Sequence, residues 1–365
     1  PINLPWVETC FRVHEIKSAM LNKALASSLT PPRISLTKLH ELRSAKMADK
    51  WHLLGDIGGT NARFGICDDQ KDQYQLIGSY EVAAFPTFNN VLEQLQSDLV
   101  KGGLSMSDAG QSCLAVAGPP DVQPVSFTNS AWRFDRKLVM TALGLQSVQI
   151  INDFAAAARA LPLLSESDLE KVGGGRAEPG APCVALGPGT GLGVATLATT
   201  HTGDPLVISG EGGHVDFAPV TNVEAAVLDF LRARYGRVSI ERLCCGEGIN
   251  NIYQALAYHR NLKIKYNTAA EIGAAALTAD DALSRETMAM FFAVLGAAAG
   301  NFALTLGAKG GIFIAGGIVP RYLDLLRRSD FRARFLAKGR FADYLSDIPT
   351  FVVTHSQLGL LGAAA

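Results

Sequence analysis

One short segment constrains the fold of this chain more than any other, because it places a glycine pair between two apolar runs. The segment reads Asp56-Ile57-Gly58-Gly59-Thr60-Asn61, and the apolar runs begin at Trp51 and at Phe64. This pattern predicts two strands joined in a β-hairpin, with the glycines at its tip. Adjacent glycines let the backbone adopt positive φ and come close to a ligand, although a glycine pair taken alone is usually only a turn.

The polar groups around this turn predict a phosphate-binding site. Successive N–H groups of a glycine turn can point into one concavity and bind an anion. The hydroxyl of Thr60 and the side-chain amide of Asn61 add donors, and Asp56 supplies a carboxylate that could hold a phosphate-bound Mg²⁺ ion. The motifs further along the chain favour this functional interpretation over a plain turn.

The length and composition of the chain predict a well-packed globular protein. Its 365 residues suffice for two domains or one large one, and 48% of them are hydrophobic while 18% are charged. The net charge of −1 argues against nucleic-acid and membrane-surface partners. The longest apolar runs contain glycines or charges well before 18 residues, so we expect no membrane-spanning helix.

The cysteines are scattered and form no C-x-x-C pair, so neither a zinc ribbon nor a thioredoxin-type site is indicated. Scattered thiols in a chain of this size predict a reducing cytoplasm. The six cysteines are Cys10, Cys67, Cys113, Cys183, Cys244 and Cys245.

The first 46 residues differ from the rest of the chain. They carry seven Lys and Arg against three Glu, and Pro31-Pro32 would interrupt a helix, so we expect a disordered N-terminal extension. A basic leader that contains serine could instead be an organelle transit peptide. We prefer the extension, because Met47-Ala48-Asp49-Lys50 reads like a natural start just before the first predicted strand.

Strands and helices alternate from residue 51 onward, which predicts an α/β fold. The order of β-meander, helix, strand, helix and strand occurs first near residue 51 and returns in weaker form after residue 184. This repetition predicts a duplicated α/β unit with a cleft between its halves. Other segments are predicted as a loop at Phe127–Asn129, a polar connection at 165–182, helices within 223–306, and strands at 311–315 and 351–354.

Two further glycine turns follow predicted strands. Gly187-Pro188-Gly189-Thr190-Gly191-Leu192-Gly193 could cradle a phosphate, although its spacing matches neither the dinucleotide fingerprint nor the P-loop. Gly316-Gly317 would let a flat ring lie against the backbone. Each loop alone is a weak signal, but three glycine turns at strand ends can surround one nucleotide.

Asn152 and Asp153 stand at the end of a predicted buried strand, where open α/β sheets gather their ligand groups. There Asp153 is well placed to accept a hydroxyl proton, and Asn152 could orient the same substrate. The alternative is that the aspartate only caps the following helix.

A second polar group of residues lies in a glycine-rich region. Glu211 and His214 belong to the sequence Glu-Gly-Gly-His, and Glu241 precedes Arg242. The alternatives are a structural histidine and a solvated helix face, and no second histidine stands at metal-ligand spacing. If these side chains converge with Asp153, their many acceptors suit a polyol, because each of its hydroxyls can donate a hydrogen bond.

Five motifs, in order, closely resemble those of the bacterial ATP-dependent glucokinase family, and the resemblance runs from about residue 51 to the end. That family belongs to the actin, hexokinase and heat-shock-chaperone ATPase superfamily. The motifs are Gly55-Asp56-Ile57-Gly58-Gly59-Thr60-Asn61-Ala62-Arg63, Ile151-Asn152-Asp153-Phe154, Gly187-Pro188-Gly189-Thr190-Gly191-Leu192-Gly193, Gly210-Glu211-Gly212-Gly213-His214-Val215-Asp216-Phe217-Ala218-Pro219 and Ile314-Ala315-Gly316-Gly317-Ile318-Val319-Pro320-Arg321.

The resemblance implies two ribonuclease-H-like α/β domains that close over ATP, the larger one with extra helices. We therefore expect a small domain of residues 47–160 with about 355–365, and a large domain of residues 161–354. The family often forms homodimers, but no feature of this sequence predicts an oligomeric state.

The resemblance also implies transfer of a phosphoryl group from ATP to the 6-hydroxyl of glucose, with Mg²⁺. It makes Asp153 the general base and assigns glucose binding to Asn152, Asp153, Glu211, His214 and Glu241. It assigns the metal to Asp56. The nucleotide would be held by Gly55, Asp56, Ile57, Gly58, Gly59, Thr60, Asn61, Gly189, Thr190, Gly191, Gly316 and Gly317.

Two departures from the family pattern stand out. Related repressors and kinases of the open-reading-frame/kinase type carry a cysteine zinc motif, whereas Cys244-Cys245-Gly246 lacks that spacing and favours the glucokinase branch. Related chains usually finish a terminal helix beyond Ala363-Ala364-Ala365, which leaves the packing of the last helix open. The alternatives to a glucokinase are a kinase for another hexose and a sugar-sensing regulator.

Overall fold

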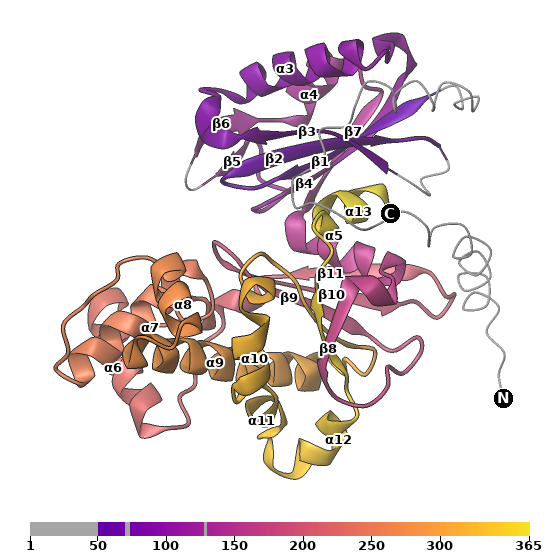
Figure 1. The fold of residues 1–365 in the computed structure, drawn as a ribbon. Coiled ribbons are helices and arrows are strands. Elements are labelled where there is room, and N and C mark those ends of the chain that lie inside the picture. The colour runs from indigo at the N-terminus through magenta and orange to yellow at the C-terminus, as the bar shows by residue number, and fades with distance from the viewer. Residues whose placement is uncertain (1–49, 70–73, 128–129) are drawn as a thin grey trace, which may run out of the picture. The chain divides into compact units, whose positions relative to one another are not determined.

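The computed structural model describes residues 50–69, 74–127 and 130–365, and these belong to one compact unit (Figure 1). The predicted disordered extension, residues 1–46, lies outside the described residues.

The first sheet consists of the predicted antiparallel meander followed by two parallel strands, in the order β3-β2-β1-β4-β7. The register sets Asp56 opposite Arg63 and Ile57 opposite Ala62, so the tip of the β1–β2 hairpin falls on the glycine pair, as predicted. β1 pairs in parallel with β4, and β4 with β7. The strands are β1 (Trp51–Ile57), β2 (Asn61–Cys67), β3 (Tyr74–Glu81), β4 (Ala109–Val116) and β7 (Ser147–Asn152).

Two helices and a small hairpin complete the first half of the fold. Helix α3 (Phe88–Lys101) buries one apolar face, and the side chain of Thr87 caps its first turn by accepting from the Asn90 N–H. Helix α4 (Arg136–Leu143) is capped by Asp135 in the same way. The predicted loop at Phe127–Asn129 is wrong at Phe127, which ends β5 (Val125–Phe127) and pairs with β6 (Ser130–Phe134). Thr128 and Asn129 lie outside the described residues.

The second sheet repeats the plan of the first, which confirms the predicted duplication. Its order is β11-β10-β9-β12-β13-β8, with an antiparallel meander β11-β10-β9 followed by parallel β12 and β13. The predicted polar connection at 165–182 is wrong in part, because β8 lies within it and pairs antiparallel with β13 at the edge of the sheet. The strands are β8 (Leu169–Gly173), β9 (Cys183–Pro188), β10 (Leu192–Thr199), β11 (Pro205–Gly210), β12 (Gly311–Ile314) and β13 (Thr350–Val353).

The extra helices predicted within 223–306 pack with the second sheet around a large apolar core. The central one is α9, which meets the length and apolar composition of a membrane span, contrary to the expectation from its glycines. About two-thirds of that stretch (67%) is buried inside the protein, so α9 is a core helix here. The helices of this half are α6 (Asn222–Tyr235), α7 (Gly246–His259), α8 (Ala269–Leu277), α9 (Ala282–Leu306), α10 (Leu323–Arg328), α11 (Phe331–Leu336) and α12 (Ala342–Ser346).

Short 3-10 turns connect the longer elements. They are η2 (Val82–Ala84), η3 (Met106–Asp108), η4 (Leu161–Leu163), η5 (Glu166–Asp168), η6 (Gly212–His214), η7 (Ile240–Arg242), η8 (Val319–Tyr322) and η9 (Gly339–Phe341). Pro320 lies in the first turn of η8, a position that suits proline.

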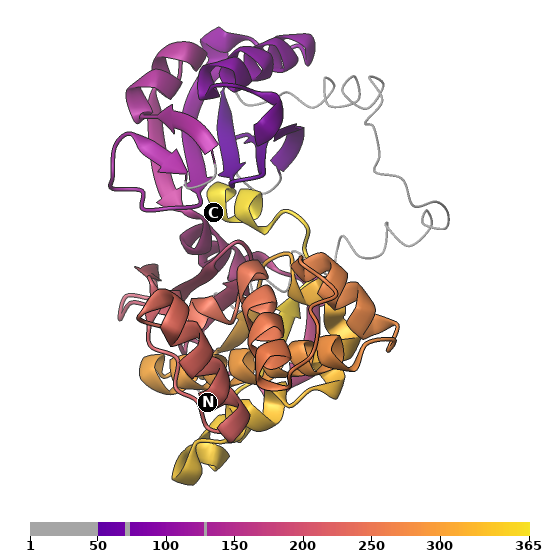
Figure 2. The same ribbon diagram turned by 90° about the vertical axis from the view of Figure 1, so that its left-hand side faces the viewer.

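Two helices are exchanged between the halves. Helix α5 (Asp153–Ala160) follows β7 of the first sheet, but its Ala157 and Ala158 pack in a cluster with Ala185 and Ala195 of the second sheet. Helix α13 (Leu358–Ala364) follows β13 of the second sheet, but its buried residues pack with Leu54 of the first (Figures 1 and 2). The last helix is thus packed, and both exchanged helices lie against each other.

Candidate active site

The glycine turn at the β1–β2 tip is tight and open to one side. The Gly58 N–H donates to the Asn61 carbonyl over 2.9 Å, and a Cβ at Gly59 would find no atom within 4 Å. Neither Gly58 nor Gly59 has positive φ, so that part of the prediction is wrong. What the glycines provide is empty space above the backbone. Thr60 holds the turn through its carbonyl, which accepts from the Val82 N–H.

The last three residues of β1 differ in their surroundings. Gly55 is a packing residue, because a Cβ there would come within 2.6 Å of the Leu114 side chain. Ile57 is fully buried in the core. Asp56 points the other way and accepts a long hydrogen bond of 3.4 Å from Arg63. Burial raises the pKa of Asp56 by more than the nearby Arg63 guanidinium lowers it.

The side chains of Asn152 and Asp153 both accept hydrogen bonds from backbone N–H groups at the start of α5. Asn152 is the N-cap, and its Oδ1 accepts from the N–H groups of Phe154 and Ala155 at 2.9 and 3.2 Å. The capping role that was the alternative for Asp153 therefore belongs mainly to its neighbour. Asp153 Oδ1 also accepts from the Phe154 N–H, at 2.9 Å. The Asn152 amide also donates to the Gly118 carbonyl at 3.4 Å.

The carboxyl of Asp153 has a strongly shifted pKa. Burial is the largest cause, and together with the negative charges of Asp56 and Glu211 it raises the pKa of Asp153 to about 7. Hydrogen bonds from the N–H groups of Phe154 and of Asp153 itself lower the pKa in part. Three predicted site residues thus lie within electrostatic reach of one another. A carboxylate with a pKa near neutrality is suited to accept a proton in a reaction at physiological pH.

Glu241 connects the predicted sugar residues with the second glycine loop. Its Oε2 accepts from the Leu192 N–H at 2.9 Å, and its Oε1 lies 4.0 Å from Nε2 of His214. The alternative of a solvated helix face is therefore wrong for Glu241, whose side chain is only 25% exposed. His214 and Glu211 remain exposed at the turn η6, where they are open to a ligand.

The second glycine loop joins β9 to β10 and is held by its own backbone. The Gly189 N–H donates to the Gly191 carbonyl at 2.8 Å, and the Gly246 N–H donates to the Gly189 carbonyl at 2.9 Å. A Cβ at Gly189 would find no atom within 4 Å, whereas one at Gly191 would collide with Glu241. Thr190 lies exposed between them.

The third glycine turn adjoins the second. Gly316 has a φ of +87°, which glycine adopts readily, and a Cβ there would lie 2.7 Å from the Pro188 carbonyl. A Cβ at Gly317 would find no atom within 4 Å. The structure thus places Gly316-Gly317 beside the loop of Gly187–Gly193.

Phe154 is a residue whose role the sequence did not indicate. Its ring lies over Gly187 and Gly193, where added Cβ atoms would come within 2.6 and 1.8 Å of ring carbons. The ring therefore joins the helix of Asp153 to the second glycine loop. The sequence shows only an aromatic residue directly after Asp153. Its partners, Gly187 and Gly193, are too far along the chain for sequence spacing to identify.

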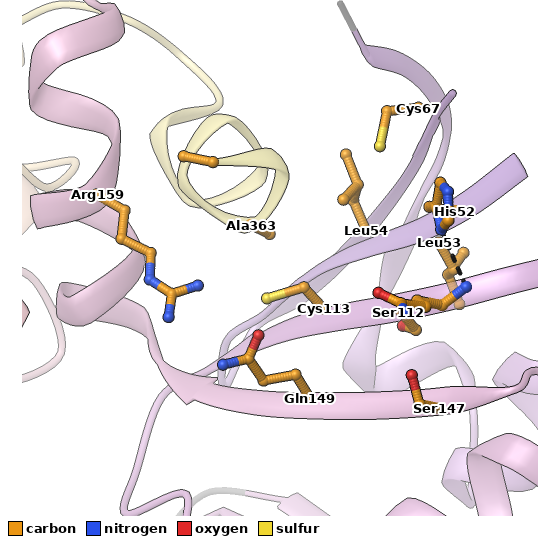
Figure 3. Close-up of a pocket in the computed structure, with 12 residues that line it drawn as sticks. His52, Leu53, Leu54, Cys67, Ser112, Cys113, Ser147, Gln149, Arg159 and Ala363 are labelled. Atoms are coloured by element: carbon orange, nitrogen blue, oxygen red, sulfur yellow. Dashed lines mark hydrogen bonds between the residues drawn. The ribbon is translucent and has the colours of Figure 1, made fainter. Parts of the chain in front are cut away.

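A separate cavity of about 260 Å³ lies elsewhere, against the first sheet (Figure 3). None of the predicted site residues lines it; its walls include His52, Ser112, Gln149, Arg159 and Ala363. No group of three or more His, Cys, Asp or Glu side chains with metal-binding geometry occurs in the described part of the chain. The predicted site residues therefore lie apart from this cavity.

Known proteins similar to this chain are glucokinases. The glucokinase family model matches residues 53–365. A glucokinase of Marinobacter nauticus is 43% identical over 318 residues, which is 87% of this chain and 97% of that protein. The crystal structure of a glucokinase from an Antarctic psychrotroph has a TM-score of 0.74 at 35% identity, over 86% of this chain and 98% of that one. A Balamuthia mandrillaris glucokinase in complex with glucose has the same fold, with a TM-score of 0.74 at 23% identity over 90% and 97% of the two chains. The chain therefore belongs to the glucokinase family and is a hexose kinase.

Proposed function

We propose that this enzyme transfers the γ-phosphoryl group of ATP to the 6-hydroxyl of glucose, giving glucose 6-phosphate and ADP. The observation that carries the proposal is the environment of Asp153, a carboxyl with a pKa of about 7 at the junction of β7 and α5. Membership of the glucokinase family supports glucose as the substrate.

In the proposed reaction Asp153 accepts the proton of the sugar hydroxyl as the oxygen attacks the γ-phosphorus. The O–H bond and the bond from the γ-phosphorus to its bridging oxygen break, and a new P–O bond forms to the sugar. Phosphoryl transfer depends mainly on positioning and charge stabilisation, so a single well-placed base is sufficient. The hydrogen bond from the Phe154 N–H keeps one carboxyl oxygen of Asp153 oriented.

Sugar binding falls to the polar groups around Asp153. We assign the hydroxyls of glucose to Asn152, Asp153, Glu211, His214 and Glu241. Glu241 is already fixed by the Leu192 N–H, so its second oxygen is oriented before the sugar arrives. A site of fixed acceptors favours sugars whose hydroxyls all find partners and disfavours analogues that lack one.

The three glycine turns are assigned to ATP. Open space above Gly59, Gly189 and Gly317 allows a ligand to approach the backbone at each turn. The turns of Gly55–Asn61 and Gly189–Gly191 would contact the phosphates, and Gly316-Gly317 would contact the adenosine. Backbone N–H groups at such turns stabilise the negative charge that develops on the phosphates.

A Mg²⁺ ion fits this donor set through one carboxylate. Mg²⁺ usually binds nucleotide enzymes through one or two carboxylates and the substrate phosphates rather than through a protein cage. Asp56 would hold it, since its carboxyl is tied to Arg63 only by a long hydrogen bond. The ion would supply neutralisation of phosphate charge when bound.

We further propose a cytoplasmic place for the enzyme, where glucose 6-phosphate enters glycolysis. Cys183, Cys244 and Cys245 are free thiols, which is common in a reducing compartment. The proposed division is a small domain of residues 47–160 with about 355–365 and a large domain of residues 161–354, and a homodimer is compatible with the family.

Sugar-dependent ADP release with Mg-ATP tests the proposed reaction. Glucose, mannose, fructose, allose and N-acetylglucosamine should be compared with a reaction that contains no sugar. We expect a strong preference for glucose and little hydrolysis without sugar, because closure around both substrates excludes water. Turnover of a different hexose would make the enzyme a kinase for that sugar. Tight sugar binding with no turnover would instead support the sugar-sensing regulator.

A further inference from the structure

Helix α13 contacts the proposed metal-binding carboxylate through a glycine. A Cβ added at Gly359 would lie 2.5 Å from Cγ of Asp56, and 2.7 and 2.8 Å from its two carboxyl oxygens. Contacts below 3.0 Å do not occur for real Cβ atoms, so any side chain at this position would force the carboxyl to move. The backbone of α13 therefore forms one wall of the space in which the Asp56 carboxyl lies.

The other restraint on Asp56 is weak by comparison. Arg63 donates to the carboxyl at 3.4 Å, near the limit for a hydrogen bond, and its side chain is 38% exposed. A long and exposed ion pair contributes little to fixing a side chain, because water and salt compete with it. Steric contact with Gly359 is thus the tighter of the two restraints.

Helix α13 also packs against α5, the helix that begins at Asp153. A Cβ at Gly362 would lie 1.8 Å from the Ala156 carbonyl in the first turn of α5. Gly359 and Gly362 are three residues apart and so lie on neighbouring positions of one helix face. Leu360, Ala363 and Ala364 are buried, and Gln357 just before the helix accepts a hydrogen bond of 3.0 Å from the Tyr74 hydroxyl.

We propose that Gly359 is a positioning residue for Asp56, and that α13 sets the separation between Asp56 and Asp153 by touching one through Gly359 and the helix of the other through Gly362. This inference rests on the roles proposed above for the two carboxylates. It gives the C-terminal helix a part in positioning the two carboxylates.

Gly359→Ala is the direct test. The clashing atoms are the end of a side chain, which can rotate away, so we expect the variant to fold with a displaced Asp56 carboxyl. A displacement of about 1 Å in a phosphoryl-transfer site can lower the rate by about 10²-fold. We expect kcat to fall by about 10- to 100-fold, the Kd of Mg-ADP measured by calorimetry to rise about 10-fold, and the Kd of glucose to change less than twofold.

Asp56→Ala supplies the matched background, because it removes the atoms that Gly359→Ala would strike. In Asp56→Ala, adding Gly359→Ala should change neither kcat nor the Kd of Mg-ADP further. Gly359→Ala should also raise the melting temperature in this background, or lower it less than it does in the wild type. The clash with Asp56 is gone there, so only the gain in helix propensity remains. If Gly359→Ala alone failed to fold, the double variant should fold.

Gly362→Ala is the control on the same helix. It strikes the Ala156 carbonyl, so it should lower the melting temperature equally with and without Asp56→Ala. Equal effects of Gly359→Ala in both backgrounds would overturn the proposal, as would a folded Gly359→Ala with normal kcat and normal Mg-ADP affinity. Because the melting-temperature comparison needs no turnover, failure of this inference is distinguishable from failure of the proposed reaction.

Discussion

At the scale of single residues, the environment of Asp153 decides what the site can do. Burial raises the pKa of the carboxyl, and Asp56 and Glu211 raise it further, so that it reaches about 7. A general base works best when its pKa lies near the working pH. The burial that raises the pKa of Asp153 therefore also suits this carboxyl to the proposed role of general base.

This pKa predicts the pH profile of the enzyme. Below pH 7 the base is protonated, so kcat/KM for glucose should fall about tenfold per pH unit and level off above it. Glu211→Gln removes one of the charges that raise the pKa of Asp153, so its acidic limb should move to lower pH. Glu93→Gln, an exposed change on α3, is the control and should leave the limb in place. A limb that moved to higher pH in Glu211→Gln would contradict this account.

The same pKa predicts a gain in stability for Asp153→Asn. The folded protein holds the Asp153 proton more tightly than the unfolded chain, so ionisation destabilises the fold as pH rises from about 4 to about 7. At pH 8 we expect the free energy of unfolding of the variant to exceed that of the wild type by on the order of 1–3 kcal/mol. Below pH 4 that difference should vanish. Urea unfolding at both pH values measures it, and a less stable variant at pH 8 would argue against a raised pKa.

Residue types and their order were enough to predict the candidate site residues, but not which role each of them has. Asn152 proves to be the helix cap that was the alternative for Asp153, because only the three-dimensional path of the chain decides which oxygen faces the N–H groups. The positive φ expected at Gly58-Gly59 is absent, since their sequence specifies space rather than one backbone conformation.

At the scale of elements, α5 links Asp153, the proposed base, to the second glycine loop. The ring of Phe154 fills the gap over Gly187 and Gly193. Phe154→Ala should leave a cavity there, at a cost of about 2–3 kcal/mol for a partly buried aromatic side chain. The loop would lose its support, so we expect the KM for ATP to rise several-fold more than the KM for glucose.

Phe341→Ala is the comparison for this prediction, because Phe341 is 45% exposed and far from the predicted motifs in sequence. It should leave both KM values unchanged. Steady-state kinetics with either substrate varied, together with urea unfolding, measures the two effects. A Phe154→Ala enzyme with equal changes in both KM values would mean that the ring does not support the loop.

Elements with strong local patterns were predictable from the sequence, and those fixed by distant partners were not. The β1–β2–β3 meander and the helix that follows it, α3, have such local patterns and are found as predicted. Strand β8 has no apolar alternation and exists because β13, almost 180 residues later, offers an edge. The β5–β6 hairpin depends on aromatic contacts such as Phe88 with Phe134, whose ring centroids are 4.0 Å apart.

At the scale of the whole molecule, the fold contains two similar halves, and the proposed site draws residues from both. Each half supplies a sheet with the same order of meander and parallel strands, and each contributes a glycine turn at its first hairpin. The repeat was visible in the sequence, but the exchange of α5 and α13 was not, because α5 is mostly alanine and α13 is only seven residues long, so neither carries a pattern that indicates its sheet. Through this exchange, helix α5, which begins at Asp153, packs against the second sheet.

The central claim is that Asp153 is the base of a glucose kinase, and Asp153→Asn tests it most directly. The asparagine keeps the size and the hydrogen-bonding oxygen of the side chain but cannot accept the hydroxyl proton. We expect turnover with glucose and Mg-ATP to fall by about 10²- to 10⁴-fold, while the Kd of glucose measured by calorimetry stays within a few-fold. Near-normal turnover in this variant would contradict the account.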